Sequence, residues 1–308
     1  MGISYGFEGN EGAGKSLLFN LTRRLLEKTT GFPVLAIREP GGTQLGENEI
    51  RPILRNEKYK GLHPLTNTLL YSAGRSEVFF QVETPFLEKN QLGILLKDRT
   101  WLSTVALQTV DGADIDYIMN VQKPFMSRPD KFIIIDIPVE ETVTRMLAEY
   151  RRKDTGREPD WRDKQDIKTL SAIRQNYLNF VVNHPDKCIV FDCFDDPWVK
   201  AAEIKLDIFK TFNSVEGTIS NAESALILPD FIEEAKVATD DLLEEVRLFS
   251  RQGSDFNPYN VNKLREDSDV ARKELGYPSR EELQKQMHKE WQNLGIEGGM
   301  SGREREPR

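Results

Sequence analysis

Short apolar runs alternate with longer stretches of helical periodicity over the first 214 residues of the chain. The runs ISYGFE, PVLAIRE, GILLKDR, KFIIIDIP and CIVFDC have the length and composition of buried strands. Each run is separated from the next by a segment long enough to hold a helix. This alternation predicts an α/β fold in which a parallel sheet is covered by helices on both faces.

The pattern of the chain changes after about residue 212, and it divides the sequence into an α/β domain and a tail. The α/β domain is expected over 1–212, and a polar linker is expected over 213–229. A helical extension is predicted over 230–296. The last residues, 297–308, are expected to be disordered.

Two amphipathic patterns lie in the extension, DFIEEAKVATDDLLEEVRLF and SREELQKQMHKEWQNL, with the turn-rich stretch SRQGSDFNPYN between them. Both patterns begin with residues at the spacing of a helix cap, and the second ends at a glycine: Asp230 with Glu233, Ser279 with Glu282, and Gly295. We expect Trp291, Leu294 and Ile296 to be buried against helices of the extension itself, although an exposed anchor for a partner stays open.

Composition excludes several classes of protein. The longest apolar runs have strand length, and no secretion signal is expected at the N-terminus, so no membrane association is predicted. The net charge is −8, and most of the acidic excess lies from Val215 onward. This balance argues against a nucleic-acid polymer as a partner. The two cysteines, Cys188 and Cys193, have no metal-binding spacing and are expected to be buried thiols in a reducing cytoplasm.

The stretch GNEGAGKS has the spacing of a phosphate-binding loop. Its glycines allow successive backbone N–H groups to turn inward, a lysine can reach the outer phosphates, and a serine hydroxyl can ligate Mg²⁺. The loop follows a predicted strand and precedes a predicted helix, as the motif requires. The predicted ATP-binding residues are Gly9, Asn10, Glu11, Gly12, Ala13, Gly14, Lys15 and Ser16.

Charged residues follow the predicted strands at the sheet edge where ligands of α/β proteins bind. They include Arg38, the pair Asp98 and Arg99, and Asp136. A second phosphate site is therefore predicted opposite the loop, with Arg38 beside a Gly-Gly turn.

A base site is predicted on the helical stretch LLYSAGRSEVFF. Tyr71 and Arg75 are one turn apart there, so that an aromatic ring and a guanidinium would project from one face. This pair suits stacking on a nucleotide base and bonding its edge. Burial of Tyr71 in a core, with Arg75 in solvent, is the alternative.

Taken together, the stretches FEGNEGAGKS, REPGGTQLGE, LLYSAGR, DRTWLSTVALQ, RPDKFIIIDIPVEETVTRM and RRKDTGRE resemble the thymidylate kinase family in content, order and spacing. The resemblance covers about the first 210 residues. It implies a P-loop nucleoside monophosphate kinase fold and an enzyme that transfers a phosphoryl group from ATP to dTMP, giving dTDP with Mg²⁺ as cofactor.

Carried over residue by residue, the resemblance implies that Lys15 and Ser16 hold ATP, that Ser16 and Asp98 serve Mg²⁺, and that Arg38 and Arg99 grip the acceptor phosphate. It also implies the remaining contacts: Glu11 to the sugar 3′-hydroxyl, Tyr71 stacked on thymine, and Arg75, Ser103 and Gln108 at the base.

The resemblance further implies a catalytic arginine in a lid, because the phosphate loop of this chain contains none. The lid is expected over about 150–163. It offers Arg151, Arg152, Arg157 and Arg162, of which Arg152 and Arg157 are the expected catalytic residues.

Three positions depart from the family pattern. The family commonly has tyrosine where this chain has Thr100 and Leu107, which leaves selection of deoxyribose over ribose open. Gly74 stands where a larger residue is usual, and glycine weakens a helix by about 1 kcal/mol relative to alanine.

Two alternatives to a dTMP kinase remain at this point. One is a kinase for another nucleoside monophosphate, such as dUMP. The other is a non-catalytic ATP-binding protein that works through its C-terminal helices. The resemblance also implies a homodimer, and the extension is a candidate surface for a partner.

Overall fold

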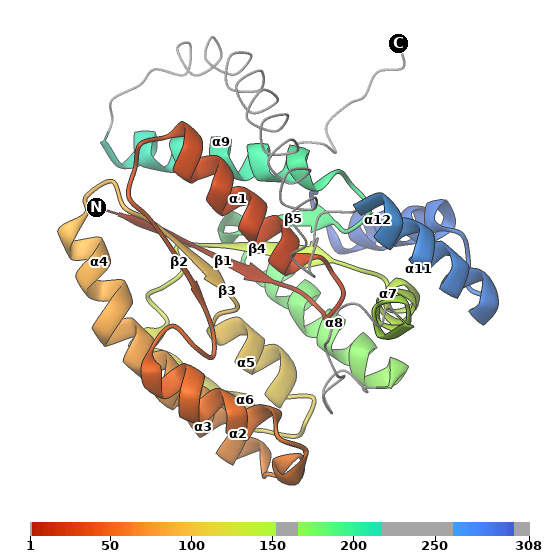
Figure 1. The fold of residues 1–308 in the computed structure, drawn as a ribbon, viewed down its shortest axis with the longest axis horizontal. Coiled ribbons are helices and arrows are strands. Elements are labelled where there is room, and N and C mark those ends of the chain that lie inside the picture. The colour runs from red at the N-terminus through yellow and green to blue at the C-terminus, as the bar shows by residue number, and fades with distance from the viewer. Residues whose placement is uncertain (1, 152–165, 217–260, 299–308) are drawn as a thin grey trace, which may run out of the picture.

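A parallel sheet of five strands forms the centre of the protein. The structure, a computed structural model, describes residues 2–151, 166–216 and 261–298. The order of the strands across the sheet is β2-β3-β1-β4-β5 (Figure 1). All five predicted strands are confirmed: β1 (Ile3–Glu8), β2 (Val34–Arg38), β3 (Ile94–Asp98), β4 (Lys131–Asp136) and β5 (Cys188–Asp192).

The register of the strands brings their carboxyl ends to one edge. Asp98 of β3 is paired with Phe7 of β1 on one side and with Arg38 of β2 on the other. At the far side of the sheet, Asp136 of β4 is paired with Asp192 of β5. Charged residues that are distant in the sequence therefore lie side by side at the carboxyl ends of neighbouring strands.

Helices α1 (Lys15–Thr29) and α9 (Pro197–Glu216) cover one face of the sheet (Figure 1). Leu18 and Leu25 of α1 and Ile204 and Ile208 of α9 are buried with strand residues such as Phe7. Because α9 continues to Glu216, the predicted linker begins later than residue 213; residues 217–229 lie outside the described part.

Helices α5 (Trp101–Gln108), α8 (Ile167–Asn183) and α12 (Arg280–Leu294) cover the other face. Trp101, Phe132 and Phe180 make edge-to-face ring contacts in this core. Helix α12 belongs to the predicted extension, so the extension completes the core of the α/β domain.

A helical arm extends from β2 and returns to β3, at the lower left of Figure 1. Its buried contact with the sheet is a cluster of Ile37, Val78, Leu87 and Leu95. The arm consists of η1 (Gly46–Ile50), α2 (Arg51–Arg55), η2 (Glu57–Tyr59), α3 (Pro64–Val78), η3 (Phe79–Glu83) and α4 (Thr84–Lys89).

None of the helices within the described residues is long and apolar enough to cross a membrane.

Four further elements connect the layers. Helix α7 follows β4 and leads into 152–165, which lie outside the described residues. The elements are α6 (Ile115–Gln122), η4 (Lys123–Phe125), α7 (Val139–Arg151) and η6 (Pro185–Lys187).

In its described part, 261–298, the extension contains one helix that the sequence predicted and one that it did not. Helix α12 begins at the predicted capping box of Ser279 and Glu282 and ends at Gly295 in the left-handed region. Helix α11 (Val261–Leu275) was not predicted. The other predicted helix, over 230–249, and the end of the tail, 299–308, lie outside the described residues.

Trp291 is buried, as expected, but residues outside the extension share in burying it. Its ring is packed in the core beneath α5 and α8, and its indole N–H donates a hydrogen bond of 2.7 Å to Asp136 at the end of β4. The extension is thus attached through an aromatic side chain to the carboxyl end of the sheet.

Candidate active site

The residues from Gly9 to Gly14 form a tight loop between β1 and α1, and Lys15 and Ser16 begin α1. Gly9 has φ +136°, and a side chain there would meet the Ile135 carbonyl oxygen at 2.3 Å. Gly14, with φ +91°, directly precedes α1. A larger residue fits neither conformation, and the first turn of α1 directs its unpaired N–H groups at the space enclosed by the loop.

Lys15 is buried inside this loop, with 5% of its surface exposed. Its ammonium donates a hydrogen bond of 2.7 Å to the Asn10 carbonyl. Burial, together with the nearby positive charge of Arg99, lowers the pKa of Lys15 to about 8. The next residue, Ser16, places its hydroxyl 3.5 Å from a carboxylate oxygen of Asp98.

Two arginines from neighbouring strand ends face the loop. Arg38 Nε lies 3.5 Å from Asp98, and Arg99 donates to the Glu11 carboxylate. Arg99 has φ +72°, which turns its side chain back across the end of β1. Burial acts to lower the pKa of Arg99, but Glu11 and other acidic neighbours outweigh it and raise that pKa. The two predicted phosphate sites are therefore adjacent.

The buried carboxylate of Glu8 holds this arrangement together. One of its oxygens accepts from the Thr100 N–H and hydroxyl, both at 2.7 Å, and from the Ser103 N–H at 3.2 Å. The other accepts from the Ser103 and Tyr177 hydroxyls. Burial raises the pKa of Glu8, and these donors and Arg99 oppose that rise. Thr100, one of the departures from the family pattern, thus fastens the start of α5 to β1.

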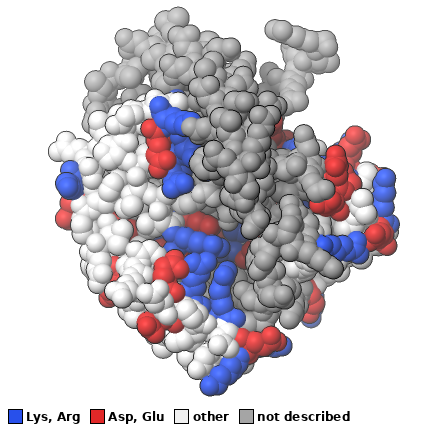
Figure 2. All heavy atoms as spheres, in the orientation of Figure 1, with Lys and Arg blue, Asp and Glu red and all other residues white. Residues whose placement is uncertain are grey.

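A cavity of about 140 Å³ opens beside the arginines, between α2, α3 and α5. Figure 2 shows basic side chains gathered near the centre of this face of the molecule. The predicted residues among those lining the cavity are Glu11, Ser16, Arg38, Tyr71, Arg75, Arg99, Ser103 and Gln108. The structure therefore brings the predicted acceptor residues together around one space, and Leu107 lines it too.

Arg75 and Gln108 at the deep end of this cavity differ in how they are bonded. Arg75 is 2% exposed, and it donates to Glu39, Thr104, Gln122 and the Thr100 carbonyl. Gln108 is fully buried, and neither its amide nitrogen nor its amide oxygen has a hydrogen-bond partner within the described residues. A buried amide without partners is costly unless a ligand bonds it.

Buried charges lie behind Arg75. Glu39 is paired with Arg75 and, at 2.8 Å, with Lys97, which also contacts Glu83 at 2.5 Å. Burial alone would raise the pKa of Glu39, but Arg75 and Lys97 outweigh it and keep that pKa below its usual value. Burial also raises the pKa of Glu83, and Lys97 offsets only part of that rise. The cluster of Glu39, Arg75, Lys97 and Glu83 is thus a balanced group of two acids and two bases.

Sequence reasoning missed several residues of this site. Arg51 and Arg55 of α2 line the same cavity, and their spacing of one helical turn was the available signal. Arg145 of α7 was also missed, although it donates to the Gly12 carbonyl at 3.1 Å. Of the predicted lid residues, Arg152, Arg157 and Arg162 lie outside the described residues. Arg151, the first arginine of the expected lid, is half exposed and pairs with Glu274 of α11.

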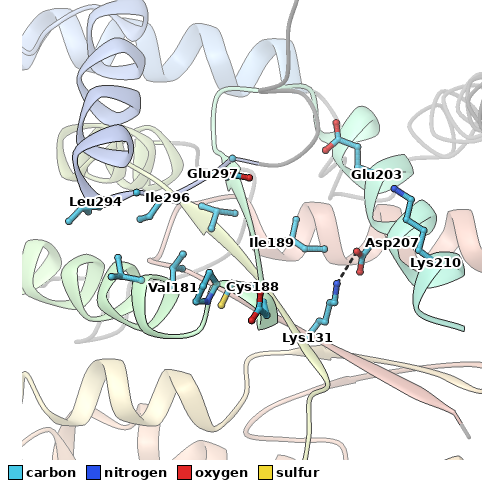
Figure 3. Close-up of a pocket in the computed structure, with 16 residues that line it drawn as sticks. Lys131, Val181, Cys188, Ile189, Glu203, Asp207, Lys210, Leu294, Ile296 and Glu297 are labelled. Carbon is cyan, nitrogen blue, oxygen red and sulfur yellow. Dashed lines mark hydrogen bonds and ion pairs between the residues drawn. The ribbon is translucent and has the colours of Figure 1, made fainter. Parts of the chain in front are cut away.

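A second cavity, of about 590 Å³, lies away from the phosphate loop (Figure 3). It is bounded by β5, by the C-terminal end of α8, by α9 and by the segment Leu294–Gly298. Lys131 and Asp207 form an ion pair of 3.0 Å at its wall. None of the predicted site residues that the structure describes lines this cavity, whereas eight of them line the smaller one.

Comparisons with known proteins agree on one family. The family model described as thymidylate kinase matches residues 7–194. A thymidylate kinase of Pelotomaculum thermopropionicum is 33% identical over 68% of this chain and 96% of its own length. A thymidylate kinase of Kosmotoga olearia is 34% identical over 60% of this chain and 85% of its own.

A solved structure supports the fold. The crystal structure of thymidylate kinase from Ehrlichia chaffeensis matches with a TM-score of 0.50 and 24% identity, covering 63% of this chain and 89% of that one. Helices α11 and α12 lie beyond the residues that the family model matches.

The buried charge cluster generates a stability prediction. Lys97→Met leaves Glu83 and Glu39 short of a positive partner, so we expect the free energy of unfolding to fall by about 3–5 kcal/mol in urea denaturation. Adding Glu83→Leu leaves the balanced pair of Arg75 and Glu39, so the double variant should recover at least half of the free energy of unfolding that Lys97→Met loses. Lys89→Met, at an exposed position of α4, is the control. Additive losses in the double variant would contradict this account of the cluster.

Proposed function

The chain belongs to the thymidylate kinase family, and from that premise we propose that it transfers the γ-phosphoryl group of ATP to dTMP, giving ADP and dTDP. The observation that best supports this reaction here is the contact of Arg99 with Glu11. It brings a guanidinium suited to an acceptor phosphate against the loop suited to the donor phosphates. A cytoplasmic location accompanies this proposal.

On the donor side, the backbone N–H groups of the loop and of the first turn of α1 would bond the ATP phosphates. Lys15 would exchange the Asn10 carbonyl for a phosphate oxygen. The oxygens of Ser16 and Asp98, 3.5 Å apart, form a hard donor set that fits Mg²⁺. A bound Mg²⁺ would supply charge neutralisation at the phosphates.

On the acceptor side, Arg38 and Arg99 would hold the dTMP phosphate in line with the γ-phosphoryl group. Because a phosphate monoester is largely ionised at neutral pH, its attacking oxygen needs no general base. The chain then contributes alignment and positive charge, which are the main requirements of phosphoryl transfer. The positive charge of Arg51 and Arg55 at the cavity adds to the attraction.

Hydrogen-bonding capacity favours a thymine or uracil base. Four of the five N–H hydrogens of Arg75 are committed to protein groups, which leaves one on Nη2 to donate to a base carbonyl. The Gln108 amide can accept from the N3–H of the ring and donate to a carbonyl. Cytosine presents an amino group where Arg75 requires an acceptor, so a cytosine base leaves both groups poorly matched.

Further parts of the proposal rest on the family resemblance. Glu11 would bond the sugar 3′-hydroxyl once Arg99 turns to a phosphate, and Tyr71 and Ser103 would line the base pocket. Arg152 and Arg157 would supply positive charge from the lid to the transferring group.

We also propose that the protein is a homodimer that associates through the arm. Helix α3 exposes Leu69 and, one turn later, Ala73, and it runs directly into η3, where Phe80 is 59% exposed. Ile115, at the start of the neighbouring α6, is exposed as well. The rings of Phe79 and Phe125 pack edge-to-face against Phe80. Exposed apolar side chains gathered in this way are typical of an interface.

The proposed reaction is tested by measuring ADP formation with dTMP, dUMP, dCMP and thymidine as acceptors. We expect turnover with dTMP, less with dUMP, and none with dCMP or thymidine. Gln108→Leu removes both amide contacts and should lower kcat/KM for dTMP by about 10–100-fold. Gln81→Leu, at an exposed position of η3, is the matched control. No turnover with any acceptor would leave the non-catalytic alternative.

The lowered pKa of Lys15 predicts a pH dependence. As pH rises through about 8, the free enzyme loses the ammonium that attracts ATP, so kcat/KM for ATP should fall by about tenfold per pH unit. With ATP saturating, the bound phosphates stabilise the ammonium, and kcat/KM for dTMP should stay level to higher pH. An equal alkaline fall in kcat/KM for ATP and in kcat/KM for dTMP, or no fall in kcat/KM for ATP below pH 9.5, would contradict the role of Lys15 in attracting ATP.

The dimer interface is tested with Phe80→Glu. A carboxylate at the exposed position of Phe80 should prevent association, and light scattering should then give the mass of one chain, whereas the unmodified protein should give twice that mass. Val270→Glu introduces the same charge at an exposed position of α11 and should leave the dimer intact. A dimeric Phe80→Glu protein would show that association uses another surface.

A further inference from the structure

Helix α11, which lies beyond the family match, packs along α7 and buries an arginine there. Arg272 is 4% exposed, and its guanidinium donates to Glu141 of α7, to Asp269 and to the Ser268 hydroxyl. An arginine is seldom buried without paired partners. Its position therefore requires the acidic group on α7.

Glu141 receives donors from both helices. Its side chain is fully buried, one oxygen accepts from Arg145 Nε at 2.6 Å and from Ser268, and the other accepts from Arg272 and Thr144. Burial acts to raise the pKa of Glu141, but Arg145 and Arg272 outweigh it and lower that pKa. One carboxylate therefore orients two guanidinium groups, one from each helix.

Arg145 carries this arrangement to the phosphate loop. While its Nε bonds Glu141, its two terminal nitrogens donate to the Gly12 carbonyl at 3.1 Å and to the Cys193 carbonyl at 3.2 Å. The C=O and the following N–H of a planar peptide point in opposite directions. A Gly12 carbonyl held on Arg145 therefore turns the Ala13 N–H toward the inside of the loop, where it donates a hydrogen bond of 3.3 Å to the Asn10 carbonyl.

We propose that Arg272 of the extension is a positioning residue for the ATP half of the site, acting through Glu141 and Arg145 on the Gly12–Ala13 peptide. The proposal rests on the proposed function, because it assumes that this loop binds the phosphates of ATP. Without Arg272, one oxygen of Glu141 keeps, among the residues that the structure describes, only the Thr144 hydroxyl, and the carboxylate is free to turn away from Arg145. The loop amide is then less well oriented for phosphate.

Within the described residues, the acceptor half of the site has no such connection to α11. Arg38 ends β2, Arg75 lies on α3 and Gln108 ends α5. The hydrogen-bond partners of Arg75 lie directly after β2, on α5 and its N-cap, and on α6. Loss of Arg272 should therefore affect ATP and spare dTMP. A variant that only destabilises the protein would not produce this difference.

The test compares Arg272→Met, Arg272→Lys and the control Arg280→Met in the full chain. Arg280 belongs to the same extension, but it donates to Arg265 and Asp269 and not to α7. For each protein, KM for ATP and for dTMP, kcat, ATP binding by calorimetry and the thermal midpoint are measured.

We expect Arg272→Met to raise KM and the calorimetric Kd for ATP about fivefold or more, with KM for dTMP changed less than twofold. Arg272→Lys keeps the charge and should recover part of the ATP affinity; it also serves if Arg272→Met does not fold. Arg280→Met should bind ATP like the unmodified protein.

Unchanged ATP affinity in both Arg272 variants, or an equal loss in Arg280→Met, would overturn the proposal. Parallel changes in both KM values would overturn it as well. If the unmodified protein bound ATP but did not phosphorylate dTMP, the proposed function would fail, while the calorimetric comparison would still decide the role of Arg272.

Discussion

The buried carboxylate of Glu8 joins the end of β1 to the start of α5, and the rest of the site depends on that join. Two backbone N–H groups and three hydroxyl groups converge on it. Between β3 and α5, Arg99 takes a left-handed conformation that returns its side chain to the phosphate loop. Since β1 and β3 are neighbours in the sheet, this one carboxylate helps to fix how the phosphate loop and Arg99 face each other.

Charge is distributed in the site according to depth. Arg38 and Arg99 line the cavity and pair with single carboxylates, those of Asp98 and Glu11, with which a bound phosphate would compete. Deeper in the molecule, Arg75 and Lys97 are neutralised by Glu39 and Glu83 within the protein itself. The outer layer is suited to binding anions, whereas the inner layer fixes the orientation of the residue that would contact a base.

The sheet and the phosphate loop could be predicted from sequence because both have local signals. Apolar runs ended by charged residues located the five strands, and glycine spacing located the loop. Helix α11 could not be predicted, because the buried side chains that the structure describes on it are Ser268, Ala271 and Arg272, none of which is a large apolar residue. The roles of Glu141 and Arg145 were equally hidden, since each depends on partners far away in the chain. For Trp291 the sequence indicated burial but not its partner, Asp136.

The central claim is that a phosphate held by Arg38 and Arg99 receives the phosphoryl group from the loop. The most direct test is the initial rate of ADP formation by the unmodified protein and by Arg99→Met, measured at saturating ATP over a range of dTMP concentrations. The account predicts that ADP forms only when dTMP is present and that the variant loses about 10²–10³-fold in kcat/KM for dTMP. ADP formation that is independent of dTMP, or an Arg99→Met protein as active as the unmodified one, would contradict it.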